Sequence, residues 1–227
     1  MDITKDEMLS MMDVAMLEPT TTEAQIRNLA EESLRERYGF VCVHSLHVKP
    51  CFEILKGTPY KIVGCVGFPM GIIKTSVKVA EVEGALADGA SEIDMVLNLG
   101  AFLGGNIQLA GDDIAAVVRA AGGRPVKVII ETPYLNRDQK VAASRLVKDS
   151  GAAFVKTCTG FSPDPMALYE DVRLIRQTVG PEMGVKASGR MRSYHRFISM
   201  VEAGANRVGL GPSGARETVR GWERAHA

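Results

Sequence analysis

The sequence has few cysteines, and their spacing suggests neither a cross-linked nor a metal-bound fold. Its 227 residues include four cysteines and four histidines. The cysteines form no Cys-x-x-Cys pair, and the histidines show no metal-ligand spacing. A disulfide framework, a zinc site or any other bound metal is therefore not expected. The residues concerned are Cys42, Cys51, Cys65, Cys158, His44, His47, His195 and His226.

The chain also lacks net charge and long apolar runs. Lysine plus arginine and aspartate plus glutamate number 27 each, so nucleic acid or an anionic membrane would find no general attraction. No run of 18 apolar residues occurs, and the first seven residues lack the basic and apolar regions of a leader peptide. We expect a cytoplasmic protein that acts on a small molecule, with neither nucleic-acid nor membrane partners.

Aromatic residues make up only 6% of the chain, whereas glycine, at 23 residues, is enriched. This profile favours an α/β protein, and the absence of a linker predicts a single domain over residues 1–227. Eight β-like runs alternate with helical segments, which predicts a (β/α)8 TIM barrel; an open doubly wound sheet is the competing architecture. The expected strands are residues 12–17, 40–44, 62–66, 92–98, 126–132, 154–157, 184–187 and 207–210, and the expected helices are 22–37, 77–88, 107–121, 137–148, 164–178 and 193–202.

A Gly-Ala pair recurs where a helical segment meets a strand. It occurs at residues 89–90, 151–152 and 204–205, before the fourth, sixth and eighth expected strands. Glycine suits the left-handed position after a helix, and alanine suits the entry to a barrel wall. Recurrence at every second strand fits a barrel, whose interior layers draw on alternate strands, although helix-to-strand loops of any architecture also favour glycine.

Three charged residues, Asp94, Lys156 and Lys186, interrupt otherwise apolar strands. A lysine attacks a carbonyl to form a Schiff base only when it is neutral, and burial together with a second ammonium would lower its pKa. A neighbouring carboxylate would move the protons of that reaction. The pattern therefore predicts class I aldolase chemistry at the carboxyl end of a barrel. Structural ion pairs between the lysines and Asp94, Glu92 or Glu131 remain the alternative explanation.

Motifs along nearly the whole chain resemble those of the deoxyribose-phosphate aldolase family. They are VGFPMG at 66–71, GASEIDMVLN at 89–98, VKVIIET at 126–132, FVKTCTGF at 154–161 and VKASG at 185–189. The resemblance implies a TIM barrel and a metal-independent class I aldolase without a cofactor. That family reversibly joins acetaldehyde to glyceraldehyde 3-phosphate to give 2-deoxyribose 5-phosphate.

The resemblance also implies roles for individual residues. By this resemblance, Lys156 is the Schiff-base lysine, Lys186 is the second lysine that perturbs the pKa of Lys156, and Asp94 is the acid/base residue. The expected partners are an aldehyde or sugar-phosphate substrate and, as a homo-oligomer, further copies of the chain in a dimer or tetramer. The substrate-binding residues implied are Asp13, Cys42, Thr157, Gly160, Ser188, Gly189, Arg190, Arg192, Gly209, Gly211 and Ser213.

Three positions depart from the family pattern. Ala15 stands where relatives usually carry a threonine two residues after Asp13. Arg190 replaces the second glycine of the phosphate-binding stretch, and Pro212 removes a backbone N–H after the eighth strand. The carboxyl-terminal tail also lacks the family's tyrosine.

These departures leave several hypotheses open. Arg190 and Arg192 would hold a phosphate together with the start of a helix near Ser213, or else the site serves a different, non-phosphorylated aldehyde. A catalytically silent barrel that binds a sugar phosphate is the alternative from another class. The remaining features suggest structural roles, because His44 fits a packing residue and Cys42 and Cys158 fit ordinary buried cysteines.

Overall fold

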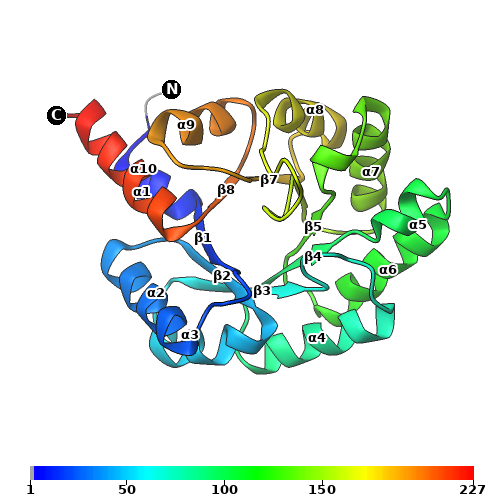
Figure 1. The fold of residues 1–227 in the computed structure, drawn as a ribbon, viewed down its shortest axis with the longest axis horizontal. Coiled ribbons are helices and arrows are strands. Elements are labelled where there is room, and N and C mark those ends of the chain that lie inside the picture. The colour runs from blue at the N-terminus through cyan, green and yellow to red at the C-terminus, as the bar shows by residue number, and fades with distance from the viewer. Residues whose placement is uncertain (1–2) are drawn as a thin grey trace.

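The computed structural model describes residues 3–227, in which eight parallel strands close into a barrel surrounded by helices (Figure 1). Met1 and Asp2, which the single-domain prediction includes, lie outside the described residues. The strands follow chain order and β8 pairs with β1, which confirms the predicted TIM barrel and excludes the open sheet. They are β1 (Met12–Met16), β2 (Phe40–His44), β3 (Lys61–Val66), β4 (Glu92–Val96), β5 (Val126–Ile129), β6 (Phe154–Lys156), β7 (Gly184–Ser188) and β8 (Arg207–Leu210).

The helices pack outside the strands and cover the barrel wall (Figure 1). They are α1 (Lys5–Met11), α2 (Glu23–Glu36), α3 (Val48–Leu55), α4 (Thr75–Ala87), α5 (Leu99–Leu103), α6 (Ile107–Ala120), α7 (Arg137–Asp149), α8 (Tyr169–Val179), α9 (Tyr194–Glu202) and α10 (Pro212–Ala225), with 3₁₀ turns at Ser45–His47 and Thr132–Tyr134. Helices α3 and α5 were not predicted from the sequence. Both helices are shorter than the length over which a helical period of apolar residues can be recognised.

Two expected elements differ from the prediction by three residues or more at one end, for local reasons, and the other elements differ by two residues or fewer. The fifth strand stops at Ile129 instead of residue 132, because Glu131 adopts a left-handed conformation and a 3₁₀ turn follows. The eighth helix begins at Tyr169 instead of residue 164. Pro163 and Pro165 lie just before it, and a residue that precedes proline is disfavoured in the helical region.

The recurrent glycines occupy the conformation that their pattern predicted. Gly89, Gly151 and Gly204 have φ angles of 107°, 83° and 109°, which favour glycine strongly. A Cβ at Gly89 would lie 2.3 Å from the Phe52 ring, and one at Gly204 would lie 2.7 Å from the Arg176 side chain. These junctions therefore need glycine both for backbone conformation and for the close packing of helix on helix.

Helices α1 and α10 lie next to each other outside the barrel strands (Figure 1). The Thr4 side chain caps α1, whose Met8 and Leu9 are buried. Indole Nε1 of Trp222 donates a hydrogen bond of 2.8 Å to the Ile3 carbonyl, which ties α10 to the segment before α1. The first and last helices thus pack against each other beside β1 (Figure 1).

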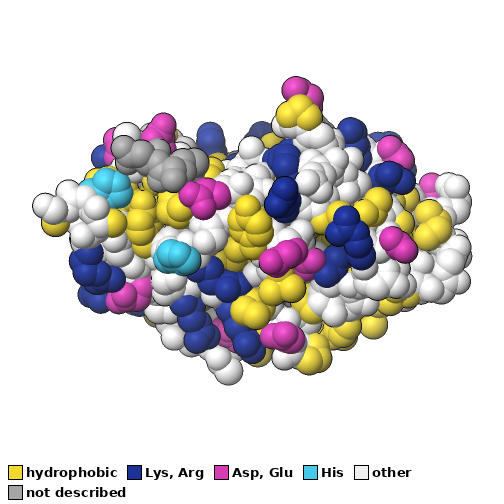
Figure 2. Space-filling view, turned by 90° about the horizontal axis from the view of Figure 1, so that it is seen from above, with side chains coloured by type: hydrophobic (Ala, Val, Ile, Leu, Met, Phe, Trp, Pro, Cys, Tyr) yellow, Lys and Arg dark blue, Asp and Glu magenta, His cyan; other side chains and the backbone are white. Residues whose placement is uncertain are grey.

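The surface carries charges of both signs. Figure 2 shows lysine and arginine side chains interspersed with aspartate and glutamate over one face, with apolar side chains between them. This mixture agrees with the balanced composition of the chain. Within residues 3–227, no helix combines the length and apolar character that crossing a membrane requires.

Strand register brings the charged interior positions together. Asp94 of β4 pairs with Cys65 on one side and Lys127 on the other. Lys156 of β6 pairs with Lys186 of β7. All five side chains are buried, so the barrel interior contains a polar cluster.

A second buried ion pair supports the stability of the barrel wall. Lys78 of α4 lies 2.5 Å from Asp113 of α6 and also donates to the Val96 carbonyl at the end of β4. Both side chains are essentially inaccessible to solvent, and burial lowers the pKa of Lys78 despite the neighbouring carboxylate. Because an unpaired buried charge is costly, this pair must remain complete.

Removal of Asp113 should therefore destabilise the protein strongly. We expect Asp113→Ala to lower the free energy of unfolding by about 3–5 kcal/mol, because it leaves the Lys78 ammonium buried without a partner. Glu23→Ala, which breaks the exposed pair between Glu23 and Arg27, should cost less than about 1 kcal/mol. Urea unfolding of both variants measures this, and equal losses would contradict the assigned importance of the buried pair.

Candidate active site

A cavity of about 640 Å³ opens at the carboxyl end of the barrel, a size typical of small-molecule sites. Its wall comes from the loops after β1, β6, β7 and β8, and two lysines form its floor. The lining residues include Lys156, Thr159, Gly160, Phe161, Lys186, Ser188, Gly189, Arg190, Arg192, Gly209, Gly211, Pro212, Ser213 and Gly214.

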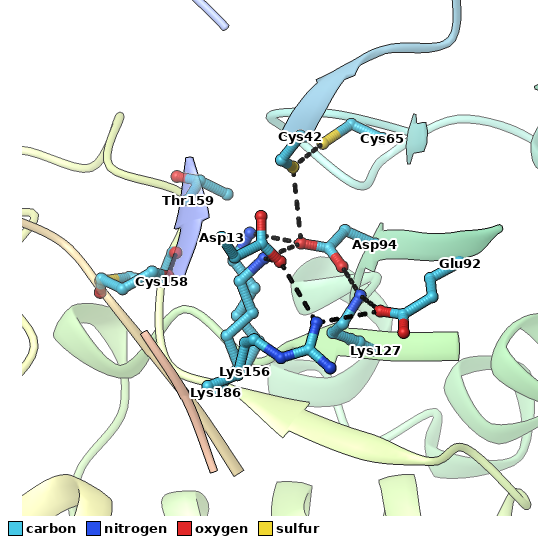
Figure 3. A network of polar contacts seen from close by, with 12 residues as sticks. Asp13, Cys42, Cys65, Glu92, Asp94, Lys127, Lys156, Cys158, Thr159 and Lys186 are labelled. Atoms are coloured by element: carbon cyan, nitrogen blue, oxygen red, sulfur yellow. Dashed lines mark hydrogen bonds and ion pairs between the residues drawn. The ribbon is translucent and has the colours of Figure 1, made fainter. Parts of the chain in front are cut away.

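Below this floor, one carboxylate receives hydrogen bonds from three lysines. Asp94 accepts from Lys127 at 2.9 Å through Oδ1, and from Lys156 and Lys186 at 2.7 and 2.8 Å through Oδ2 (Figure 3). All four side chains are almost completely buried. The three residues predicted to be catalytic therefore converge on one point, although they come from three different strands.

Further charged groups surround the Asp94 cluster. Lys186 also pairs with Asp13 at 2.5 Å, and Lys127 pairs with Glu92 at 2.7 Å. Arg207 lies 3.2 Å from Glu92 and 3.9 Å from Asp13. Three lysines and one arginine thus face three carboxylates. If all are ionised the network carries one surplus positive charge, so loss of one proton would balance it.

The electrostatics of Lys156 differ from the sequence-based expectation. Burial is the largest influence and lowers the pKa of Lys156, and Lys186 lowers it further, as predicted. Asp94 opposes both, however, and the net result is a pKa above the ordinary lysine value. The prediction of a lowered pKa is therefore wrong for the protein without substrate, because it gave Asp94 a role in proton transfer but did not include its effect on the pKa of the amine.

The partners of Lys156 are shifted in the direction that keeps the network ionised. Burial raises the pKa of Asp94, but Lys127, Lys156 and Lys186 together hold it well below its usual range. Burial lowers the pKa of Lys186, yet Asp13 and Asp94 raise it well above the ordinary value. Lys186 thus stays a cation beside Lys156, and Asp94 stays the carboxylate that both ammonium groups share.

Side-chain hydrogen bonds fix the ends of β6 and β7 relative to each other. The Thr157 hydroxyl donates to the Ser188 carbonyl and accepts from the Ser188 N–H, both at 2.9 Å. The Ser188 hydroxyl in turn donates to the Cys158 carbonyl at 2.5 Å. These contacts hold the strand that carries Lys156 beside the strand that carries Lys186.

Most predicted substrate-binding residues line the cavity, but three do not. Gly160, Ser188, Gly189, Arg190, Arg192, Gly209, Gly211 and Ser213 belong to its wall. In contrast, Asp13, Cys42 and Thr157 are buried outside the cavity lining, where they contact Lys186, Asp94 and Ser188 respectively. Direct contact of these three with a substrate stays a prediction.

Pro212 occupies a position where a missing N–H costs little. It is the first residue of α10, after the N-cap Gly211, and the first N–H of a helix has no intrahelical partner. Ser213 and Gly214 follow it in the first turn and line the cavity. A Cβ at Gly214 would lie 2.2 Å from the Met191 carbonyl, so only glycine fits there. The helix start therefore retains its capacity to bind an anion despite the proline.

Arg190, at the position of a glycine in the family pattern, has a left-handed backbone conformation of the kind that glycine favours. Its φ angle is 52°, and its side chain is half exposed on the cavity rim, with Nη1 3.7 Å from Asp164. A Cβ at the preceding Gly189 would lie 2.3 Å from the Pro165 carbonyl. The loop after β7 thus keeps its close backbone packing, and Arg190 adds a cation at its edge.

Neighbouring strands also bring together two cysteines that are distant in the sequence. Cys42 and Cys65 approach to 3.5 Å between sulfur atoms, and Cys42 lies 3.8 Å from Asp94. Within residues 3–227, the three residues form a group whose ligand atoms are close enough to hold a metal ion, which spacing along the chain did not reveal. A cation there would compete with Lys156 and Lys186 for the same Asp94 oxygen.

The sequence analysis assigned no role to Lys127 or Arg207, and it considered Glu131 only as an ion-pair partner. Lys127 interrupts an apolar strand in the same way as Lys156, so the signal that identified Lys156 was present. Arg207 begins its strand and therefore resembled a surface residue. Glu131 accepts hydrogen bonds from Thr159, and nothing in its spacing indicated that contact.

Comparison with known proteins agrees with this site. The model of the DeoC/LacD family aldolases matches residues 6–218. Deoxyribose-phosphate aldolase of Macrococcus caseolyticus is 48% identical over 198 residues, which cover 87% of this chain and 90% of that protein. The enzyme of Thermococcus kodakarensis is 46% identical, with 90% and 93% covered.

Solved structures give the same result. An aldolase named QR15 superposes with a TM-score of 0.90 at 36% identity, with 96% of this chain and 97% of that chain covered. Deoxyribose phosphate aldolase from Aeropyrum pernix, described as uniquely tetrameric, superposes with a TM-score of 0.89 at 26% identity, with 98% and 93% covered. The chain therefore belongs to the DeoC/LacD family of aldolases.

Proposed function

We propose that this protein is a metal-independent Schiff-base aldolase that reversibly cleaves 2-deoxyribose 5-phosphate to acetaldehyde and glyceraldehyde 3-phosphate. The observation that carries the proposal is the position of the Lys156 amine. It lies on the floor of an open cavity, 2.7 Å from Asp94 and beside the cation of Lys186. Relatives that are 44–48% identical and carry the name deoxyribose-phosphate aldolase support the choice of substrate.

The first step requires a neutral amine at Lys156. Its ammonium already donates to Asp94, so the proton has an acceptor at hydrogen-bond distance. Release of this proton from Asp94 to solvent would also remove the surplus positive charge of the network. The amine then adds to the substrate aldehyde to form a carbinolamine, and loss of water from the carbinolamine gives an iminium. In the proposal, Asp94 transfers the protons of these steps while Lys186 stabilises its negative charge.

The iminium then accepts the electrons of the carbon–carbon bond that breaks. Electrons of the bond between the second and third substrate carbons move toward the iminium nitrogen and leave an enamine on Lys156. The hydroxyl on the third carbon loses its proton to Asp94 and becomes the aldehyde of glyceraldehyde 3-phosphate. Return of this proton to the second carbon converts the enamine into an iminium, and its hydrolysis, which takes up the water lost earlier, releases acetaldehyde and the free lysine. No metal or cofactor takes part in these steps.

The opposite end of the cavity suits the substrate phosphate. The first turn of α10 presents backbone N–H groups and the positive end of its dipole, and Ser213 and Gly214 line the cavity there. Arg190 and Arg192 belong to the same wall. We infer that the helix start binds the phosphate and that Arg190 adds a charge-assisted contact, in place of the contacts of the glycine-rich family pattern.

The proposed setting is the cytoplasm, and the proposed assembly is a homo-oligomer, either dimer or tetramer. All four cysteines are free, which suits a reducing compartment. Several apolar side chains between β3 and α6 are exposed, which suits a contact between copies of the chain. They include Met70, Ile72, Val77, Leu103 and Ile107.

Trapping of the imine tests the central step. Borohydride reduction with acetaldehyde should add one ethyl group to the peptide that contains Lys156, as measured by mass spectrometry. Lys127, a buried lysine of the same network that does not line the cavity, should remain unmodified and is the internal control. Lys156→Arg should abolish turnover and labelling, because guanidinium stays protonated. Labelling of another lysine at full yield would refute the assignment.

Replacement of Lys186 tests the electrostatic role of the second cation. Lys186 lowers the pKa of Lys156, so Lys186→Met should raise the pKa of Lys156 further above the ordinary value. The acid limb of the pH profile for imine formation should therefore move to higher pH, because the neutral amine appears later. We expect kcat to fall roughly 10²-fold, the size of a lost proton-transfer contribution. An unchanged pH limb would remove this role from Lys186.

Comparison of substrates with and without phosphate tests the role of Arg190. If Arg190 contacts the phosphate, Arg190→Gly should weaken the binding free energy of 2-deoxyribose 5-phosphate by about 1.5 kcal/mol, which raises its KM roughly tenfold. This is the low end for a charged hydrogen bond, because the side chain is half exposed. The kcat/KM for unphosphorylated deoxyribose should not change. A stronger preference for the phosphate in the variant would mean that Arg190 obstructs the phosphate site.

A further inference from the structure

Glu131 has an unusual backbone conformation directly beside the proposed imine site. It follows β5 and has φ and ψ angles of 53° and 63°, in the left-handed region. Among residues 3–227, only Arg37 and Arg190 share a positive φ without being glycine. Conformations of this kind persist where surrounding contacts impose them, and they cluster at functional sites. Its side chain is also 3% exposed, which is rare for a glutamate.

The Glu131 carboxylate is held by one residue of the loop after β6. It accepts the Thr159 N–H at 3.1 and 3.2 Å and the Thr159 hydroxyl at 2.5 Å. The Thr159 oxygen in turn accepts the Phe161 N–H at 3.0 Å. The segments that follow β5 and β6 are thereby joined by a series of hydrogen bonds that ends in the cavity wall.

This series of hydrogen bonds from Glu131 through Thr159 to Phe161 determines how the cavity wall interacts with a substrate. Thr159, Gly160 and Phe161 line the cavity and begin three residues after Lys156. A hydroxyl has one proton and two lone pairs, and the Thr159 proton is directed to Glu131. One lone pair accepts from Phe161, so the other remains as an acceptor. The wall at Thr159 can therefore accept from a substrate hydroxyl but has no proton to donate.

We propose that Glu131 is a positioning residue, which acts through Thr159 to fix the 159–161 wall and to keep the Thr159 hydroxyl as an acceptor for a hydroxyl of the acceptor aldehyde. The inference rests on the proposed aldolase function and names its specificity for hydroxylated aldehydes. Glu131 is not a direct acid or base in this scheme. Its oxygens are occupied by Thr159, and it is not among the residues that line the cavity.

A double-mutant cycle separates this role from general structural support. Glutamine at position 131 fits the same space but has an NH2 donor in place of one carboxylate oxygen, so it cannot accept from the Thr159 N–H and hydroxyl as the carboxylate does. We expect Glu131→Gln to raise KM for 2-deoxyribose 5-phosphate on the order of tenfold, the size of one hydrogen bond. Thr159→Val should act similarly, and the double variant should lose no more than the worse single variant.

A substrate that lacks the hydroxyl provides the specificity readout. Exchange of acetaldehyde methyl protons with deuterated water needs only the imine and enamine on Lys156, so Glu131→Gln and Thr159→Val should lower its rate far less than the rate of 2-deoxyribose 5-phosphate cleavage. The matched control is Asp171→Asn. Asp171 is a buried carboxylate that pairs with Lys140 at 2.6 Å between α7 and α8, outside the cavity lining. This variant should lower the melting temperature without change in KM.

Each outcome decides the proposal. Additive losses in the double variant would mean that Glu131 does not act through Thr159. Equal losses of acetaldehyde exchange and deoxyribose-phosphate cleavage would mean general damage to the site, which also overturns the inference. If the wild-type protein shows no acetaldehyde exchange, the proposed aldolase function itself fails and this inference fails with it. Wild-type exchange together with additive losses would refute the role of Glu131 alone.

Discussion

The buried Asp94 carboxylate is the contact on which the rest of the site depends. Transfer of three ammonium groups from water into a barrel interior is costly, and each must find a carboxylate there. Asp94 is the one residue that contacts Lys127, Lys156 and Lys186 together, while Asp13 and Glu92 pair with one lysine each. Without Asp94 the reactive amine would be buried beside like charges and would have no partner.

The same arrangement explains how an amine with a raised pKa can still be reactive. The proton on Lys156 is shared with the group that would remove it, so activation needs a transfer within one hydrogen bond. This transfer leaves the net charge of the network unchanged, and release of the proton to solvent would then remove the surplus positive charge. The carboxylates thus permit burial of the lysines, and Asp94 also gives the Lys156 proton an acceptor in direct contact.

The sequence predicted much of this fold because both of its signals are local. Apolar runs of strand length and glycines after helices identified the strand order, and a charge inside such a run identified Asp94, Lys156 and Lys186. It could not show which carboxylate pairs with which lysine, since that depends on strand register around a closed barrel. The direction of the Lys156 pKa shift was wrong for that reason. The conformation of Glu131 was equally hidden, because contacts with a loop 28 residues away impose it.

The departures from the family pattern have less effect in three dimensions than along the chain. Pro212 removes an N–H in the first turn of α10, where N–H groups have no intrahelical partner, and Arg190 has a left-handed backbone conformation of the kind that glycine favours. The backbone of this part of the cavity wall is therefore compatible with both departures. In the proposed function, the start of α10 binds the phosphate while Lys156 binds the aldehyde, so both ends of a phosphorylated aldehyde are held at once. Loss of a motif residue is thus weak evidence for a changed substrate when the backbone that the motif served is retained.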